Sequence, residues 1–177
     1  MAKRLIPDKI ENFNVYLGTA ADSNRLIGIT DEITLPKLEN MSETINLAGM
    51  AGEYDSPTVG QYKSMEIEIP FSNISKETLE IAARDNEPMI MRSSQEFIDP
   101  ETHKKDRSNR TITVKGMTKA VNYGRLKKGS FGNPSITKEI TYYKDEIAGE
   151  VVTEIDKFNG KAVIGGVDMT KDILDYI

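Results

Sequence analysis

The chain has 177 residues, 38% hydrophobic and 29% charged, with a net charge of -5 and no cysteine, which excludes a disulfide framework and a thiolate metal site. No apolar run approaches the ~20 residues of a membrane helix, and none follows Lys3 and Arg4 as it would in a signal peptide. We therefore expect a protein made in the cytoplasm, with one domain over residues 1–177 whose polarity indicates much surface relative to core.

The N-terminal part predicts an arm followed by two short strands. Residues 1–12 are expected to form a mobile or partner-bound arm. Residues 13–17 and 26–29 are short apolar runs, and the stretch 18–24 between them is typical of a turn.

Residues 32–71 contain the clearest strand signal. In the second half, apolar residues alternate with polar residues and a proline: Met65, Ile67, Ile69 and Phe71 against Ser64, Glu66, Glu68 and Pro70. This period of two predicts a strand with one face on the core and the other toward water or a polar partner. Residues 33–38 predict another strand, in which Pro36 requires an edge, a bulge or a bend.

Residues 49–60, between these strands, contain three glycines and a proline and predict a long structureless connection. A long ordered loop normally has a partner surface, so we expect it to leave its own domain and contact a neighbouring subunit. The alternative is a flexible surface loop without a partner.

Residues 75–84 predict a helix. Ser75 is a favourable N-cap, and Leu79, Ala82 and Ala83 fall on one face. A helix this short is marginal alone, so it must pack against a sheet.

The C-terminal half predicts mostly strands. Fragments at 89–92 and 96–98 precede a polar loop over 99–109, and longer strands follow at 110–121 and 136–147. In the first long strand, Gly116 indicates a bulge or a close backbone approach. In the second, Ile136, Ile140 and Tyr142 are expected opposite Thr137, Thr141 and Tyr143.

The last elements are a hairpin and a short helix. Asn159-Gly160 is typical of a tight hairpin turn between two strands. Asp168 is expected to cap a helix with an apolar stripe of Met169, Ile173, Leu174 and Ile177. The fold class is therefore mainly β: an antiparallel sandwich or half-barrel with one inserted helix and a short C-terminal helix.

Residues suited to catalysis are scarce. His103 is the single histidine and lies among lysines in a loop, where a solvated role is the expectation. Glu66 and Glu68 share one strand face, which favours a polar lining over an acid–base pair facing across a substrate. The glycine-rich stretch 129–132 lacks the strand-to-helix setting of a phosphate loop. We expect no enzyme activity, no cofactor and no metal site.

Charge is unevenly distributed along the chain. Residues 101–128 contain nine basic and two acidic residues, so this segment carries +7 and the remainder -12. Such a segment could face an acidic surface of another copy or a nucleic-acid backbone, or be a solvated hairpin and loop. Tyr123 is its one aromatic residue, which argues against a stacking platform for single strands.

Two stretches resemble a known family. One is Thr34-Leu35-Pro36-Lys37-Leu38 with Ala48-Gly49-Met50; the other is Glu154-Ile155-Asp156-Lys157-Phe158-Asn159-Gly160 with Gly166-Val167-Asp168. They resemble the major tail tube protein of contractile-tailed phages and of phage-tail-like (R-type) bacteriocins. The chain differs from the pattern of this family at Lys157, where proline is common, and at Gly165, where asparagine is expected. Residues 92–110 have no recognisable counterpart in the family.

The resemblance implies a subunit of hexameric rings that stack into a tube within a contractile sheath. Two hairpins per subunit would join across the ring into one lumen barrel. Implied partners are other copies, the sheath protein, baseplate and tail terminator proteins, and tape-measure protein or DNA in the lumen. The implied location is a virion tail or a released extracellular particle.

The same resemblance assigns candidate site residues. Inner strands would cover residues 33–47, 61–71, 110–121 and 136–147. The bore would be lined by Ser64, Glu66, Glu68, Thr111, Thr113, Lys115, Thr137, Glu139 and Thr141. The next ring would be contacted by Gly49, Met50, Gly52, Glu53, Tyr54, Asp55, Pro57 and Gly60.

The alternative function is a monomeric β-sandwich module that binds a carbohydrate or another small ligand. Such a module needs an aromatic platform. Aromatic residues make up 7% of the chain and tryptophan is absent, which argues against it.

Overall fold

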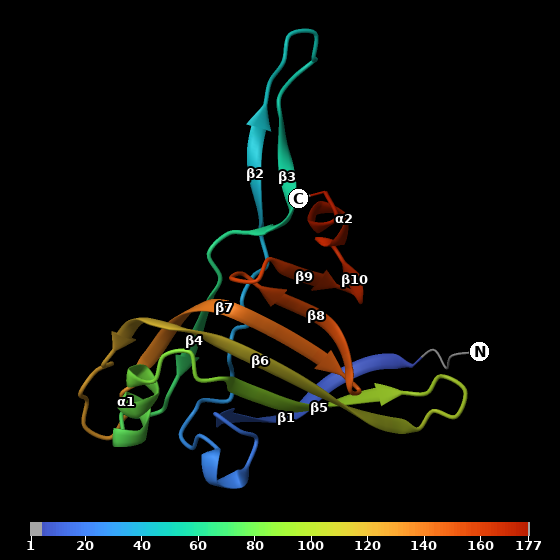
Figure 1. Cartoon of the computed structure of the whole chain (residues 1–177). Coiled ribbons are helices and arrows are strands. Elements are labelled where there is room, and N and C mark those ends of the chain that lie inside the picture. The colour runs from blue at the N-terminus through green and yellow to red at the C-terminus, as the bar shows by residue number, and fades with distance from the viewer. Residues whose placement is uncertain (1–4, 177) are drawn as a thin grey trace.

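The computed structural model describes residues 5–176 and consists mainly of antiparallel strands (Figure 1). The strands are β1 (Ile6–Leu17), β2 (Asn40–Ile45), β3 (Tyr54–Tyr62), β4 (Glu66–Pro70), β5 (Met89–Ile98), β6 (Lys105–Asn122), β7 (Ser135–Ile147), β8 (Glu150–Asp156), β9 (Lys161–Ile164) and β10 (Val167–Asp168). The helices are the 3-10 turn η1 (Asp22–Asn24), α1 (Lys76–Ala83) and α2 (Lys171–Leu174).

One large sheet has the order β1-β5-β6-β7-β8-β9-β10. Strand β4 pairs with the first half of β7 and β8 with the second half, so both lie along one edge of β7. Strands β2 and β3 form a separate two-stranded ribbon that projects from the body (Figure 1). The mainly-β antiparallel prediction is confirmed, and within the described residues the sheet of a single chain is not closed into a barrel.

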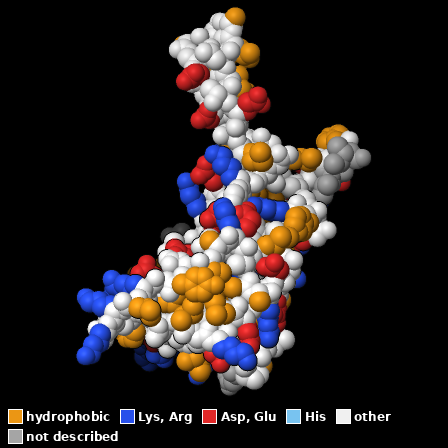
Figure 2. Space-filling view, turned by 90° about the vertical axis from the view of Figure 1, so that its left-hand side faces the viewer, with side chains coloured by type: hydrophobic (Ala, Val, Ile, Leu, Met, Phe, Trp, Pro, Cys, Tyr) orange, Lys and Arg blue, Asp and Glu red, His pale blue; other side chains and the backbone are white. Residues whose placement is uncertain are grey.

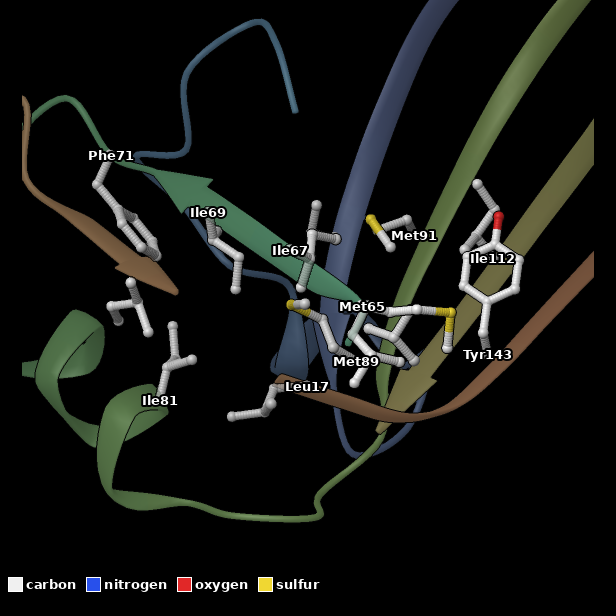
Figure 3. Packing of buried hydrophobic residues seen from close by; sticks show 14 of the residues in the cluster. Leu17, Met65, Ile67, Ile69, Phe71, Ile81, Met89, Met91, Ile112 and Tyr143 are labelled. Carbon is white, nitrogen blue, oxygen red and sulfur yellow. The ribbon is translucent and has the colours of Figure 1, made fainter. Parts of the chain in front are cut away.

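The core covers one face of the large sheet. The four alternating apolar residues from Met65 to Phe71 each expose at most 1% of their surface, whereas Glu66 and Glu68 are exposed, as the alternation predicts. Figure 3 shows them in one cluster with apolar side chains of β1, β5, β6, β7 and α1. Burial of this face fixes the register of β4, because a one-residue slip would turn the glutamates inward.

The predicted irregularity at Gly116 is present. The register of β6 on β7 slips there, leaving Thr141 as an extra residue in β7. A Cβ atom at Gly116 would lie 2.1 Å from the carbonyl oxygen of Glu139, so the two backbones approach too closely for a side chain. The bulge also shifts the alternation, because Tyr143 is buried and Tyr142 is not, opposite to the sequence expectation.

The expected N-terminal arm is mostly wrong. Residues 6–12 belong to β1, which pairs with β5 through to Leu17, while residues 1–4 lie outside the described residues. The first half of this strand is exposed on both faces, so it lacks the apolar alternation by which a strand is recognised.

The expected inner strand over residues 33–47 is also wrong. Residues 33–39 form no strand, although Ile33, Leu35 and Leu38 pack against the core. Residues 40–45 are β2, and β3 occupies most of the connection expected to be structureless over 49–60. The inner strand expected over 61–71 is divided between the end of β3 and β4.

The helices agree with expectation in place but not in detail. Ser75 caps α1, since its hydroxyl accepts the N–H of Thr78 at 3.2 Å. The buried face holds Ile81 in place of Leu79, which is 39% exposed. Asp168 lies in β10 and accepts the N–H of Thr170 at 2.9 Å, so α2 begins later than expected.

The structure corrects three further expectations in the second half of the chain. The polar loop over 99–109 shortens to 99–104, because β6 begins at Lys105. The hairpin at Asn159-Gly160 has a four-residue connection between β8 and β9 in place of a two-residue turn. In the expected apolar stripe, Met169 and Ile173 are exposed, whereas the side chain of Leu174 and all of Ile177 lie outside the described residues.

Candidate assembly surfaces

The face of the large sheet opposite the core is polar. It carries seven of the nine candidate bore residues, because each alternates with a buried residue on its strand: Glu66 and Glu68 on β4, Thr111, Thr113 and Lys115 on β6, and Thr137 and Glu139 on β7. Cα pairing places Glu66 opposite Glu139 and Glu68 opposite Thr137. The structure therefore brings these residues together across three strands.

The other two candidates lie at irregular positions beside this face. Ser64 precedes β4, and its hydroxyl donates to Oε2 of Glu139 at 2.6 Å. Thr141 is the bulged residue, and its hydroxyl donates to the carbonyl oxygen of Lys115 at 3.3 Å. Both therefore hold neighbouring strands together at this face.

Glu139 is the most connected carboxylate of the polar face. Besides the Ser64 hydroxyl, it accepts the N–H of Met65 at 3.3 Å and faces Nζ of Lys157 at 3.5 Å. Burial raises the pKa of this carboxyl group, but the hydrogen bonds and the lysine charge outweigh it, and the pKa lies below its ordinary value. Glu139 is therefore charged at neutral pH and ties β4 and β8 to β7.

Sequence reasoning missed further members of this face. Tyr142 turns onto it after the bulge, and its hydroxyl donates to Oε1 of Glu154 at 3.1 Å. Burial and that hydrogen bond raise the pKa of Tyr142 to about 12. Lys115 lies over the ring, with Nζ 5.4 Å from the centroid. A bulge at Gly116 was the available signal, but its effect on alternation depends on which strand holds the extra residue.

The ribbon of β2 and β3 is exposed along most of its length. The candidate inter-ring residues Gly49, Met50, Gly52 and Glu53 lie in the turn between the strands, and Tyr54, Asp55, Pro57 and Gly60 lie on β3. Pro57 is tolerated because each strand of a two-stranded ribbon has a free edge.

The base of the ribbon is fixed by ion pairs between the residues that flank it and by a close approach to the N-terminus of α2. Glu39 accepts hydrogen bonds from Lys37 at 2.8 Å and Lys63 at 2.5 Å, and these bonds lower the pKa of its carboxyl group to about 2. A Cβ atom at Gly60 would lie 2.6 Å from the methyl group of Thr170. The structure thus gives Gly60 a contact within the chain, whereas the other seven candidates project outward.

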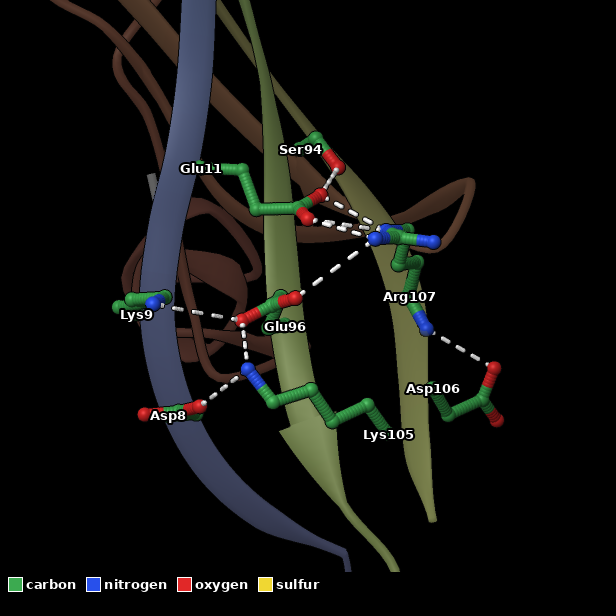
Figure 4. A network of polar contacts seen from close by, with 8 residues as sticks. All are labelled: Asp8, Lys9, Glu11, Ser94, Glu96, Lys105, Asp106 and Arg107. Carbon is green, nitrogen blue, oxygen red and sulfur yellow. Dashed lines mark hydrogen bonds and ion pairs between the residues drawn. The ribbon is translucent and has the colours of Figure 1, made fainter.

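Much of the basic segment is paired internally. Figure 4 shows Lys105 and Arg107 of β6 around Glu96 of β5, with Asp8, Lys9 and Glu11 of β1 beside them. Glu96 is buried, and Lys105 Nζ lies 2.8 Å from its Oε2. Hydrogen bonds from Arg107 and Ser94 lower the pKa of Glu11 to about 2. This network holds the exposed half of β1 on the sheet.

Two more cations of the basic segment are used within the chain. Arg110 binds Asp145, with Nη2 2.5 Å from Oδ2 on the core side, and Lys119 binds Glu66 on the polar face. Among the residues that the structure describes, no ion pair joins Arg125, Lys127 or Lys128 to a carboxylate. These three lie in the exposed loop between β6 and β7.

Lys138 is a buried cation that sequence reasoning also missed. It lies between Ile136 and Ile140 on the core side of β7, and its Nζ donates to the carbonyl oxygen of Arg84 at the end of α1 at 2.9 Å. Burial lowers the pKa of this amine. The alternation of β7 predicts this inward position, which marks Lys138 as a link between sheet and helix.

The residues considered for catalysis are not brought together. His103 lies in the turn between β5 and β6, with φ of 54°, and the stretch 129–132 lies in the β6–β7 loop. In the described part of the chain, no group of three or more His, Asp or Glu side chains could hold a metal ion. Over the same residues, no helix has the length and apolarity needed to cross a membrane.

The chain matches the family model of phage tail tube protein FII over residues 7–176. It is similar in structure to the sheath/tube terminator of an extracellular contractile injection system, PVC, at 10% identity and a TM-score of 0.53, covering 79% of this chain and 96% of that one. It is also similar to a chain of the PVC sheath–tube complex at 11% identity and a TM-score of 0.51, covering 82% and 93%. No curated protein sequence matches. At these identities the two structures show a shared fold.

Proposed function

Because the chain belongs to the phage tail tube protein FII family, we propose that it is a structural subunit of the inner tube of a contractile tail or a related injection system. Six copies form a ring, and rings stack into a hollow conduit. The similarity in fold to chains of an extracellular contractile injection system supports this proposal. The conduit carries DNA in a phage and ions or small solutes in a bacteriocin.

The observation that carries the proposal is a large sheet with an open edge. On the edge of β1 away from β5, Val15 accepts a hydrogen bond from Leu26, but no described strand pairs with residues 6–14 on that side. Exposed strand edges invite pairing with another chain, and closure into a barrel removes them. A neighbouring subunit in a ring would cover this edge.

The polar face is the surface that would line the bore. It is opposite the core and lies across β4, β6 and β7. Two of its cations, Lys119 and Lys157, already pair with Glu66 and Glu139. Phosphate binding needs available cations, so this face suits a conduit along which DNA moves without binding tightly.

The remaining partners follow from the tube. A sheath protein would surround it, a baseplate and a terminator would bind its two ends, and a tape-measure protein or DNA would fill the lumen. The subunit would be made in the bacterial cytoplasm and end in a virion tail or a released particle. A monomeric ligand-binding module is the competing function.

Size-exclusion chromatography with light scattering, followed by negative-stain electron microscopy, separates the two functions. A tube subunit at high concentration should give rings or stacked tubes. A compact monomer at every concentration, with retention on immobilised glycans, would support the binding module instead.

A further inference from the structure

Two exposed surfaces of the chain have opposite charge, and each also exposes apolar side chains. The first is the projecting ribbon over residues 40–62, which contains Glu43, Glu53 and Asp55 and no basic residue. The second is the loop over residues 123–131, which contains Arg125 and two lysines and no acidic residue. We propose that the ribbon of one copy docks on the loop of a copy in the next ring, an inference that rests on the proposed tube.

The ribbon presents a surface suited to a protein partner. Apolar side chains of its tip and strands are exposed between the carboxylates: Met41, Leu47, Met50, Tyr54 and Val59. Figure 2 shows acidic and hydrophobic side chains together on this projection. A ribbon of two strands has little core of its own, so a partner surface is needed to bury these residues.

The loop presents the complementary surface. Leu126 is fully exposed, and Tyr123 and Phe131 are each 68% exposed. Clusters of exposed apolar side chains beside charged ones are typical of interaction sites. Aromatic residues, which are common anchors of interfaces, flank the cations Lys127 and Lys128 in the sequence.

The base of the loop is built to hold its shape. Gly124 has φ of 70°, and a Cβ atom there would lie 2.2 Å from the carbonyl oxygen of Gly132. The N–H of Arg125 donates to that same oxygen at 2.9 Å, and the N–H of Gly132 donates to the carbonyl oxygen of Ser72 at 3.1 Å. A loop fixed at its base loses less conformational entropy when it binds.

The two surfaces cannot meet within one chain. Figure 1 shows the tip of the ribbon and the β6–β7 loop at different ends of the molecule. A contact between different surfaces of identical copies is heterologous, and repetition of such a contact gives an open-ended stack. The geometry therefore agrees with ring-to-ring growth and needs no other partner.

Paired charge reversals test this contact. One variant carries Glu43→Lys and Glu53→Lys, a second carries Lys127→Glu and Lys128→Glu, and a third combines all four changes. Like charges placed opposite each other should raise the protein concentration needed for stacking by at least about tenfold in the first two variants. The combined variant should return to within about threefold of the original protein, because every reversed charge again meets its opposite.

The controls separate the failure of this inference from that of the tube itself. Lys104→Glu changes the net charge in the same direction as the loop variant, in the β5–β6 turn, which Figure 1 shows away from both surfaces, and should stack normally. Circular dichroism must show all variants folded. If the original protein forms no rings or tubes, the proposed function fails. If it forms tubes but either reversal stacks normally, or the combined variant does not recover, the docking inference is wrong.

Discussion

At the scale of single residues, the side chains of β4 decide which face of the sheet is apolar. Ile67 exposes none of its surface, whereas Glu68 beside it is exposed. An unpaired charge buried in an apolar core costs several kcal/mol. Ile67→Lys should therefore abolish folding, while Glu68→Lys on the same strand should fold. Circular dichroism and thermal melting measure both, and a well-folded Ile67→Lys protein would contradict the assignment of faces.

Glu11 should make the protein sensitive to acid. Its pKa is lowered from 4.5 to about 2 by Arg107 and Ser94, so its stabilising effect is complete above pH 4.5 and is lost as the pH falls toward 2. Glu11→Gln should be less stable at neutral pH and lose less stability between pH 5 and pH 2.5. Urea unfolding at the two pH values tests this.

The arginine partner gives an independent check of the same pair. Arg107→Gln removes the main cause of the lowered pKa and should flatten the acid dependence to a similar degree. If both variants lose as much stability in acid as the original protein, the Glu11–Arg107 pair does not hold β1 in solution.

At the scale of elements, the bulge between β6 and β7 requires glycine at residue 116. Gly116→Ala would force the backbones apart and should destabilise the fold by about 1–3 kcal/mol. Gly52→Ala is the matched control, since a Cβ atom there meets nothing within 4 Å. Denaturant unfolding should separate the two variants, and equal stability would argue against the close approach.

The ribbon should be dispensable for folding and necessary for stacking. Replacing residues 43–56 with Asn-Gly would shorten both strands and keep Ser42 opposite Pro57. Only ribbon residues are removed, so the melting temperature should stay close to that of the original chain. Electron microscopy should show rings without long tubes. Tubes of normal length would contradict the assigned role of the ribbon.

Sequence reasoning succeeded where one face of an element is buried and failed where neither is. The alternation from Met65 to Phe71 identified β4, and Gly116 indicated the bulge. The first half of β1 has exposed residues on both faces, so its pairing with β5 depends on the ionic network of Glu96, which spans distant parts of the chain. The glycines of the ribbon are typical of a loop, and nothing local shows that β2 and β3 pair.

The candidate site was predictable in part for the same reason. Strand alternation placed seven bore candidates on one face of the sheet. The side chain of Tyr142 lies on that face because the extra residue of the bulge is in β7 and not in β6, which the sequence does not show. Lys105, Arg107 and Arg110 form ion pairs with carboxylates on other strands, which the sequence does not reveal. The net charge of residues 101–128 therefore overstated how much positive charge is unpaired.

At the scale of the whole molecule, the subunit has an apolar face that is covered, a polar face that is open, and an outer edge of β1 that has no neighbouring strand from Ile6 to Asn14 among the described residues. A ring of copies would place the polar faces inward and α1, which packs on the core side, outward. The chain has no cysteine, so single cysteines can report the two faces without background.

The most direct test of this arrangement is the labelling of assembled particles with a bulky polyethylene glycol maleimide. Cysteine at Glu68, on the polar face, should be labelled in dissociated subunits and protected in tubes. Cysteine at Lys76, on the exposed side of α1, should be labelled in dissociated subunits and in bare tubes without a sheath. Equal labelling of the two positions in tubes, or protection of residue 76 alone, would contradict a bore lined by the polar face.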